Sequence, residues 1–312
     1  MINRRHIRVK VMQSVYAFLQ SKSDGLDKEE NFLYNSIDKM FDLYVLLLRL
    51  LVEVRNLEKK HIVISQKKFL ATPEELKPNT KFIENQIFQL LEESVSLKNY
   101  IEANKLNYWN LDNEYVHEIL KLTKKSKSYA TYMNSKKSSF QEDKEFVVAL
   151  FKEIIAPNEK LADYFEDKNI SWVDDIPFVN TWIVKTLNQM KVAEAFKLGN
   201  LYKDEGDKKF VIDLFRKVVL NHTEFEKEVI DKTPNWDTDR IAEIDMILIK
   251  MAICEFLKFP SIPARVTINE YIEIAKDYST EKSSFFINGV LDKILKDFTA
   301  SKRLDKIGRG LL

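Results

Sequence analysis

Glycine is the residue that this sequence lacks most clearly. Only six glycines occur in 312 positions, and none lies between Leu26 and Leu198. Glycine-rich phosphate loops, dinucleotide-binding turns and tight hairpins depend on glycine because their backbones need φ > 0. The gap therefore argues against such sites in more than half of the chain. It favours helices joined by short polar links.

Cysteine is nearly absent as well. The single Cys254 cannot form an internal disulfide and lies in an apolar run, which predicts a buried thiol in a reducing compartment. The first residues lack the apolar segment of a secretory signal. The most apolar stretch, Phe41 to Val54, is shorter than the roughly 20 residues of a membrane span. We therefore expect a cytoplasmic protein without a membrane segment.

Recognisable catalytic and metal-binding motifs are absent too. The sequence has no Walker loop, no nucleophile elbow and no zinc-protease helix. Its four histidines are far apart in sequence. Adjacent acids on a helix point about 100° apart, so the acid pairs do not predict an acid–base pair. We expect no enzyme activity, no cofactor and no metal.

The charge is balanced, with 49 basic and 48 acidic residues, so any nucleic-acid surface must come from local clustering. One such cluster opens the chain with Arg4, Arg5, Arg8 and Lys10. Helical spacing places the three arginines on one flank, followed two turns later by Tyr16 with Gln13 beside it. Arginines for phosphate and a ring for a base are typical of single-stranded RNA binding. A basic helix whose Tyr16 belongs to the core would show the same pattern.

Apolar residues recur at helical spacing along the chain, which predicts an all-α protein. The expected helices are 3–22, 27–59, 81–104, 113–134, 139–155, 208–231, 237–258, one that begins at Pro263 or Thr267 and ends at 278, and 279–300. The link over 60–79 is expected to hold a short extended piece at 61–65. Ser171 and Ser279 are expected to cap helices, and the tail after Ser301 is expected to fray.

Three motifs in the last third of the chain carry a family resemblance. They are Trp236-Asp-Thr-Asp-Arg240 through Glu255, Ile262-Pro-Ala-Arg-Val-Thr-Ile-Asn269-Glu270, and Phe286-Ile-Asn288-Gly289-Val-Leu-Asp292. In this order, and with the arginine-rich first helix, they resemble the NusB family of transcription antitermination factors. The resemblance covers 1–23 and 206–312, whereas 24–205 shows none.

The resemblance implies a fold of two perpendicular three-helix bundles. It implies a NusB-like RNA-binding core at 1–23 and 206–312, with an additional helical domain of unknown role at 24–205 inserted after the first helix. Members of this family bind the boxA element of nascent RNA together with the ribosomal protein NusE and promote transcription of ribosomal RNA. The expected partners are therefore a boxA-like single-stranded RNA, NusE and the RNA polymerase antitermination complex.

The resemblance also assigns residues to surfaces. The implied RNA-binding residues are Arg4, Arg5, Arg8, Gln13, Tyr16, Phe286 and Asn288. Lys10 and Lys282 join them because each adds a cation near RNA phosphate. The implied partner-binding residues, on the NusE face, are Asp245 and Glu255. A core position for Phe286 and a capping role for Asn288 stay open.

A second class of function also stays open. The apolar stripe of 32–54 is wide, and a surplus apolar face has to pack against something. This would suit a helical protein–protein interaction module or a homodimeric adaptor in which the insertion is the working surface. Some RNA methyltransferases carry a NusB-like domain, but this chain has no cofactor-binding glycine loop. The insertion could also cover the RNA face or the NusE face.

Overall fold

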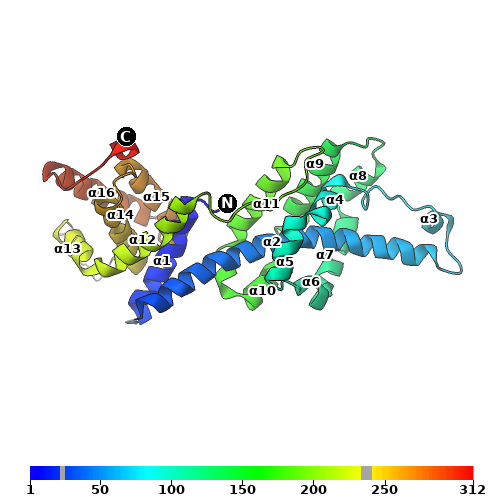
Figure 1. Ribbon diagram of the computed structural model, residues 1–312, viewed down its shortest axis with the longest axis horizontal. Coiled ribbons are helices and arrows are strands. Elements are labelled where there is room, and N and C mark those ends of the chain that lie inside the picture. The colour runs from blue at the N-terminus through cyan, green and yellow to red at the C-terminus, as the bar shows by residue number, and fades with distance from the viewer. Residues whose placement is uncertain (22–24, 233–240, 312) are drawn as a thin grey trace. The chain divides into compact units, whose positions relative to one another are not determined.

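The structure is a computed structural model that describes residues 1–21, 25–232 and 241–311 (Figure 1). Every regular element among these residues is helical, which confirms the predicted all-α class. The chain divides into two compact units. Unit 1 comprises Met1–Ile37 and Leu201–Leu312, and unit 2 comprises Asp38–Asn200. Within the described ranges, no helix is both long enough and apolar enough to cross a membrane.

Unit 1 is built around one buried helix. Its elements are α1 (Arg4–Ser21), the start of α2 (Leu26–Gln66), α12 (Glu205–Leu220), α13 (His222–Lys232), α14 (Glu243–Lys258), α15 (Ala264–Tyr278) and α16 (Ser283–Ala300). Every residue of α14 from Ile247 to Phe256 is buried, including the charged Lys250 and Glu255, and the other eight are apolar, as expected of a helix that is packed on all sides. α1, α12 and α14 contact one another, and so do α14, α15 and α16. α14 therefore belongs to both groups of three helices.

Unit 2 holds the remaining helices. They are the rest of α2, α3 (Pro73–Leu76), α4 (Gln86–Glu93), α5 (Val95–Ala103), α6 (Tyr108–Leu111), α7 (Asn113–Lys125), α8 (Lys127–Asn134), α9 (Phe140–Leu150), α10 (Glu159–Lys168) and α11 (Ile176–Gln189). A π-helical turn, Phe151–Ile155, extends α9. Aromatic rings fill much of the core. The rings of Tyr132 and Phe146, for example, stack with their centroids 4.1 Å apart.

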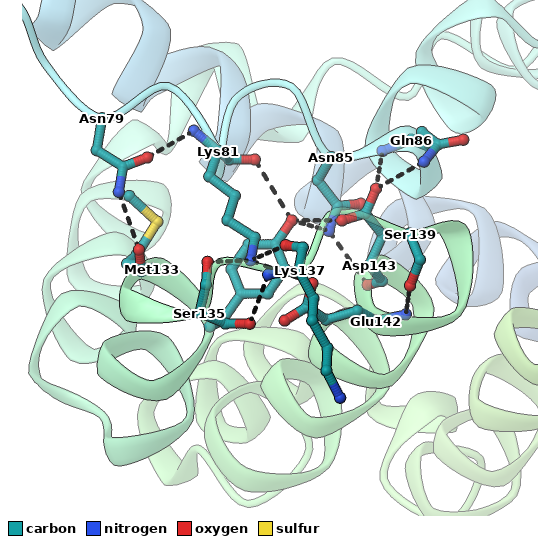
Figure 2. Close-up of polar contacts among 11 residues, drawn as sticks. Asn79, Lys81, Asn85, Gln86, Met133, Ser135, Lys137, Ser139, Glu142 and Asp143 are labelled. Atoms are coloured by element: carbon teal, nitrogen blue, oxygen red, sulfur yellow. Dashed lines mark hydrogen bonds and ion pairs between the residues drawn. The ribbon is translucent and has the colours of Figure 1, made fainter.

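A buried polar network joins α4 to α8 and α9 in unit 2 (Figure 2). The Asp143 carboxylate accepts hydrogen bonds from the Tyr132 hydroxyl at 2.6 Å and from the Gln86 backbone N–H at 2.9 Å. Asn85 donates to the Asp143 carbonyl at 3.1 Å and caps α4 through its own side-chain oxygen. These contacts satisfy the polar groups at the start of α4, where backbone N–H groups lack intrahelical partners.

Several predicted helix boundaries are wrong. α2 continues to Gln66, so residues 61–65 are helical rather than extended. Once a helix has formed, each further residue adds one hydrogen bond, and no glycine or proline stops α2 before Pro73. The predicted helices 81–104 and 113–134 each divide at a serine. Ser94 and Ser126 accept from backbone N–H groups three residues ahead and so begin α5 and α8.

The predicted caps at Ser171 and Ser279 are wrong as well. Asp175 occupies the N-cap position of α11, and that helix ends at Gln189. Ser279 ends α15, and α16 begins at Ser283. α15 begins at Ala264, the earlier of the two expected starts, and Thr267 lies buried inside it. The predicted helix 208–231 divides at Asn221 into α12 and α13.

The C-terminal tail is anchored rather than frayed. The Lys306 ammonium donates hydrogen bonds of 3.1 Å to the backbone carbonyls of Glu255 and Phe259. The buried Gly310 packs so closely on Pro260 that an added Cβ would lie 1.9 Å from the Pro260 carbonyl oxygen. The tail therefore covers the end of α14.

The two compact units do not share the borders of the predicted core and insertion. The units meet at Ile37/Asp38 and at Asn200/Leu201, whereas the prediction places the borders at 23/24 and 205/206. The first turns of α2 belong to unit 1, where the Arg216 guanidinium forms a two-pronged pair with the Glu30 carboxylate. The predicted core and insertion stay a prediction.

Candidate nucleic-acid interface

The position of α1 on α14 decides which of its side chains reach solvent. Arg8 pairs with Glu255 near one end, and Gln20 donates to the Glu243 carboxylate at 2.6 Å at the other. The two contacts are about 18 Å apart along each helix. α1 therefore lies antiparallel along α14. Residues 6–15 of α1 are all buried except the half-buried Gln13, so the side chains of α1 that reach solvent lie toward its two ends.

A buried ion pair fixes this arrangement. The Arg8 guanidinium donates to the two Glu255 carboxylate oxygens at 2.6 and 2.9 Å, and the two side chains are only 2% and 0% exposed. The same carboxylate accepts from Thr267 Oγ1 at 3.0 Å and from Tyr271 Oη at 2.8 Å. Burial by itself lowers the pKa of Arg8, but the charge and hydrogen bonds of Glu255 outweigh it and raise the pKa above its ordinary value. Arg8 therefore positions α1 and presents no surface to RNA in this structure.

Arg4 and Arg5 remain partly exposed. Arg5 donates two hydrogen bonds, of 3.0 and 2.9 Å, to the Glu270 carboxylate on α15, which raise the pKa of Arg5. Arg4 pairs with Asp207 on α12 at 2.7 Å. Both arginine side chains are close to 45% exposed. Each guanidinium is thus held in place by one acid while part of it stays open to solvent.

Tyr16 shares its helix face with Arg5. The two are eleven residues apart, close to three full turns, so they point in nearly the same direction. Tyr16 is 38% exposed, and Gln13 beside it is half-buried. Lys10, by contrast, is 2% exposed. The row from Arg5 to Tyr16 is therefore exposed at its two ends, with Val9 and Met12 between them only 5% and 1% exposed, and it differs from the row through Arg8 that the spacing indicated.

The start of α16 carries a second set of predicted residues. Lys282 and Asn288 are exposed, and Phe286 is half-buried. The most exposed aromatic ring on α16 is that of Phe285, at 80%, which is not among the predicted residues. Helical periodicity could have found it. The buried positions Ile287, Val290, Leu291 and Ile294 define the core face of α16, and Phe285 lies on the opposite side.

Contacts at the beginning of α14 bring the two sets toward one end of the unit. Glu243 at the start of α14 contacts Gln20 of α1. Two residues further along α14, Asp245 accepts a hydrogen bond of 2.6 Å from the Ser279 hydroxyl. The Ser279 hydroxyl also lies 2.9 Å from the hydroxyl of Ser283 at the start of α16. The Tyr16 end of α1 and the first turn of α16 therefore both lie near the N-terminal end of α14. Arg4 and Arg5 lie toward its other end.

The two predicted partner-binding residues are buried. Asp245 is 5% exposed and Glu255 is 0% exposed. Asp245 orients Ser279, and Glu255 compensates the charge of Arg8. Both therefore have internal roles, and neither presents a surface to a partner in this structure. The first residues of the motif that carries them, 236–240, lie outside the described residues.

The described parts of unit 1 show no arrangement suited to metal or thiol chemistry. No three His, Cys, Asp or Glu side chains in the part of the chain that the structure describes could hold a metal ion. Cys254 is buried, and burial raises the pKa of its thiol above the ordinary value. The candidate site is therefore a surface of arginine, amide and aromatic side chains, which are suited to binding.

Comparison with known proteins places the chain among relatives. A family model described as the NusB family matches residues 178–296. The transcription antitermination protein NusB of Salinibacter ruber is 43% identical over 112 residues, which cover 36% of this chain and 70% of the relative. The protein of the same name from Chloroherpeton thalassium is 38% identical over 39% of this chain and 58% of the relative. The one from Finegoldia magna is 36% identical over 35% of this chain and 78% of the relative. No solved structure matches the chain significantly.

Proposed function

Because this chain belongs to the NusB family, we propose that it is a transcription antitermination factor that binds nascent RNA through unit 1. The proposal includes a boxA-type single-stranded RNA as ligand, NusE as protein partner and assembly with RNA polymerase, without catalysis. The observation that carries it is the exposure of Arg5 and Tyr16, the two ends of one row on α1.

The row offers both kinds of contact that single-stranded RNA needs. A guanidinium binds phosphate through two parallel N–H donors, and Arg5 already presents such a pair to the Glu270 carboxylate. Tyr16 supplies a ring for a base, with a typical contribution of about 1–3 kcal/mol per stacked base. Phe285 and Lys282 at the start of α16 would add a second ring and a further cation. Arg8 contributes as a positioning residue, since it holds α1 on α14.

RNA has to compete with acids that are already present. Glu270 and Asp207 occupy part of the donors of Arg5 and Arg4. A phosphate would displace these carboxylates or share the guanidinium with them. Binding should therefore weaken with salt, with a slope of about 0.7 per phosphate neutralised on a single strand.

Asp245 and Glu255 can contribute to NusE binding only indirectly in this structure. Both are buried, so we propose that they support the binding surface from inside. The wide apolar stripe that suggested a homodimeric adaptor is used within unit 2, where the α2 residues 43–48 are at most 2% exposed. This burial accounts for most of the stripe that favoured the alternative; Phe32, which is 53% exposed, is its exposed member.

Fluorescence anisotropy with a boxA-type RNA tests the proposal on the full chain. We expect Arg5→Ala with Tyr16→Ala to weaken binding at least about tenfold, since one stacked base alone contributes about 1–3 kcal/mol. Arg216→Ala is the matched control, because Arg216 is also a half-exposed arginine paired with a carboxylate, Glu30. Unchanged affinity in the double variant, or an equal loss in the control, would show that this row is not the RNA surface.

A further inference from the structure

A run of lysines in unit 2 is the strongest charge asymmetry in the chain. From residue 119 to residue 141 there are six lysines and no acid, although the whole chain carries a net charge of only +1. The run covers the end of α7, all of α8 and the loop after it. All six lysines are exposed.

Contacts with α2 add to this surface. The Lys124 ammonium lies 2.5 Å from the Glu58 carboxylate, and the rings of His61 and His117 have centroids 5.8 Å apart. The end of α7 therefore lies against α2 at residues 58–61. Lys60, which is exposed, sits next to His61 in this stretch. We define the lysine surface as Lys60, Lys121, Lys125 and Lys127.

Folding does not explain the lysine surface. None of its four lysines forms a salt bridge with another of the described residues. Lys121 and Lys125 stand one turn apart on α7, where like charges repel. Lys127 is the first residue of α8, the end at which the helix dipole disfavours a cation. Lys125 lies in the last turn of α7, where the dipole favours a cation, so only Lys127 stands at an unfavourable helix end. No salt bridge within the described residues uses the four lysines, which suits a surface kept for binding.

The surroundings favour a polyanion over an apolar partner. Along 112–169, none of the large apolar side chains that the structure describes is exposed, whereas Val63 and Ile64, near Lys60 on α2, are 42% and 62% exposed. Protein interfaces bury an apolar and aromatic centre, and amphipathic membrane helices bury an apolar face, so both would need such side chains. Single-stranded RNA can be bound through its phosphates by charge alone.

Nearby acids limit where a phosphate chain could lie. A groove of about 710 Å³ beside α8 is lined by Lys127 and Lys137 but also by Glu142, Glu145 and Glu153. These carboxylates would repel phosphate from the groove. The favourable path therefore runs over the end of α7 and the start of α8.

We propose that the lysine surface binds the phosphate backbone of single-stranded RNA without reading its sequence. The chain then holds RNA at two places, a short element on unit 1 and flanking RNA on unit 2. This second contact extends the RNA-binding function proposed for unit 1. It rests on that proposed function only in taking the boxA-type element as the RNA that the flanks adjoin.

The test replaces Lys60, Lys121, Lys125 and Lys127 together by glutamine in the full chain. Binding is measured over a series of salt concentrations with two RNAs, one carrying only the boxA-type element and one with long unstructured flanks. We expect the wild-type chain to prefer the long RNA and the variant to lose that preference. For the long RNA, the log–log salt slope should fall by about 0.7 for each lysine that contacts a phosphate. Affinity for the short RNA should stay unchanged.

A control variant replaces four other exposed lysines of unit 2 by glutamine. Lys98, Lys105, Lys152 and Lys185 have no salt bridge to another described residue and lie outside the run. An equal loss in this variant would reduce the effect to net charge and overturn the proposal. Wild-type affinity of the lysine-surface variant for the long RNA would also overturn it. If that variant had instead lost binding to anionic lipid vesicles, the surface would be a membrane contact and not an RNA contact. Lysine-dependent binding of long RNA without any binding of the short element would support this inference and refute the function proposed for unit 1.

Discussion

Replacement of Glu255 by glutamine should destabilise unit 1 strongly. The substitution keeps the shape of the side chain but removes the nearest charge that compensates Arg8, which is 2% exposed, and leaves the Glu270 carboxylate 3.7 Å from the Arg8 guanidinium. Breaking a buried ion pair by removing one partner typically costs about 3–5 kcal/mol, because the remaining charge is left uncompensated. The cost should lie in this range. The Glu255 carboxylate accepts from Arg8, Thr267 and Tyr271 through two oxygens, whereas a glutamine amide has only one oxygen that can accept.

A second substitution tests the stated cause. In Arg8→Met with Glu255→Gln, no buried charge remains, and the amide oxygen can still accept from Thr267 and Tyr271. We expect the double variant to recover about half or more of the lost stability, as expected for coupled neighbours. The pKa of Arg8 is raised above its ordinary value, so its contribution is fully present below the ordinary pKa of arginine and is lost only as the pH rises through the raised pKa. The result should therefore not depend on pH near neutrality.

Urea unfolding followed by circular dichroism measures the effect. In a Trp236→Phe background the remaining tryptophans, Trp109, Trp172 and Trp182, all belong to unit 2. Their fluorescence then reports on unit 2, while circular dichroism reports on both units. With m near 2 kcal/mol/M, the loss should move the transition of unit 1 by about 2 M urea and the fluorescence transition by less. Unchanged midpoints would refute the importance of the pair. A double variant as unstable as the single one would refute the uncompensated charge as the cause.

Three further outcomes are expected. Glu270→Gln should tighten RNA binding several-fold in the anisotropy assay, because it removes the acid that competes for Arg5; a loss of affinity would contradict this. Gly310→Ala should release the tail, since its Cβ would overlap Pro260, and hydrogen exchange of residues 303–311 should accelerate. Burial raises the pKa of Glu92, but the charge and hydrogen bond of Arg55 outweigh it and hold the pKa below 4.5. Unit 2 should therefore lose stability as the pH falls below about 4.5, and Glu92→Gln should blunt that loss in fluorescence-monitored unfolding.

The sequence predicted helices well where apolar spacing or a proline within the same segment sets their bounds. The apolar spacing of α1 and the proline after α9 place those elements close to their observed bounds. Ser94 and Ser126 were missed because a serine is compatible with a helix interior and becomes a cap only when its side chain turns to the backbone. The anchored tail was missed because Lys306 binds carbonyls of α14, which no local pattern encodes.

The candidate site shows the same limit. The arginines at the start of α1 indicated a surface, and Arg4 and Arg5 are indeed partly exposed. Arg8 is buried because its partner, Glu255, stands 247 residues away in the sequence. Spacing along one helix cannot reveal such a pairing. Phe285 is a different case, since the periodicity of α16 contains the information and only the motif directed attention to Phe286.

Photocrosslinking of a boxA-type RNA that carries thiouridine tests the central claim most directly. The claim is that unit 1 binds this RNA through the face of α1 that bears Arg5 and Tyr16, with the start of α16 beside the far end. We predict crosslinked peptides that contain Tyr16 or Phe285, and their loss in the Arg5→Ala/Tyr16→Ala variant. Crosslinks found only within unit 2, or on unit 1 helices other than α1 and α16, would contradict the account.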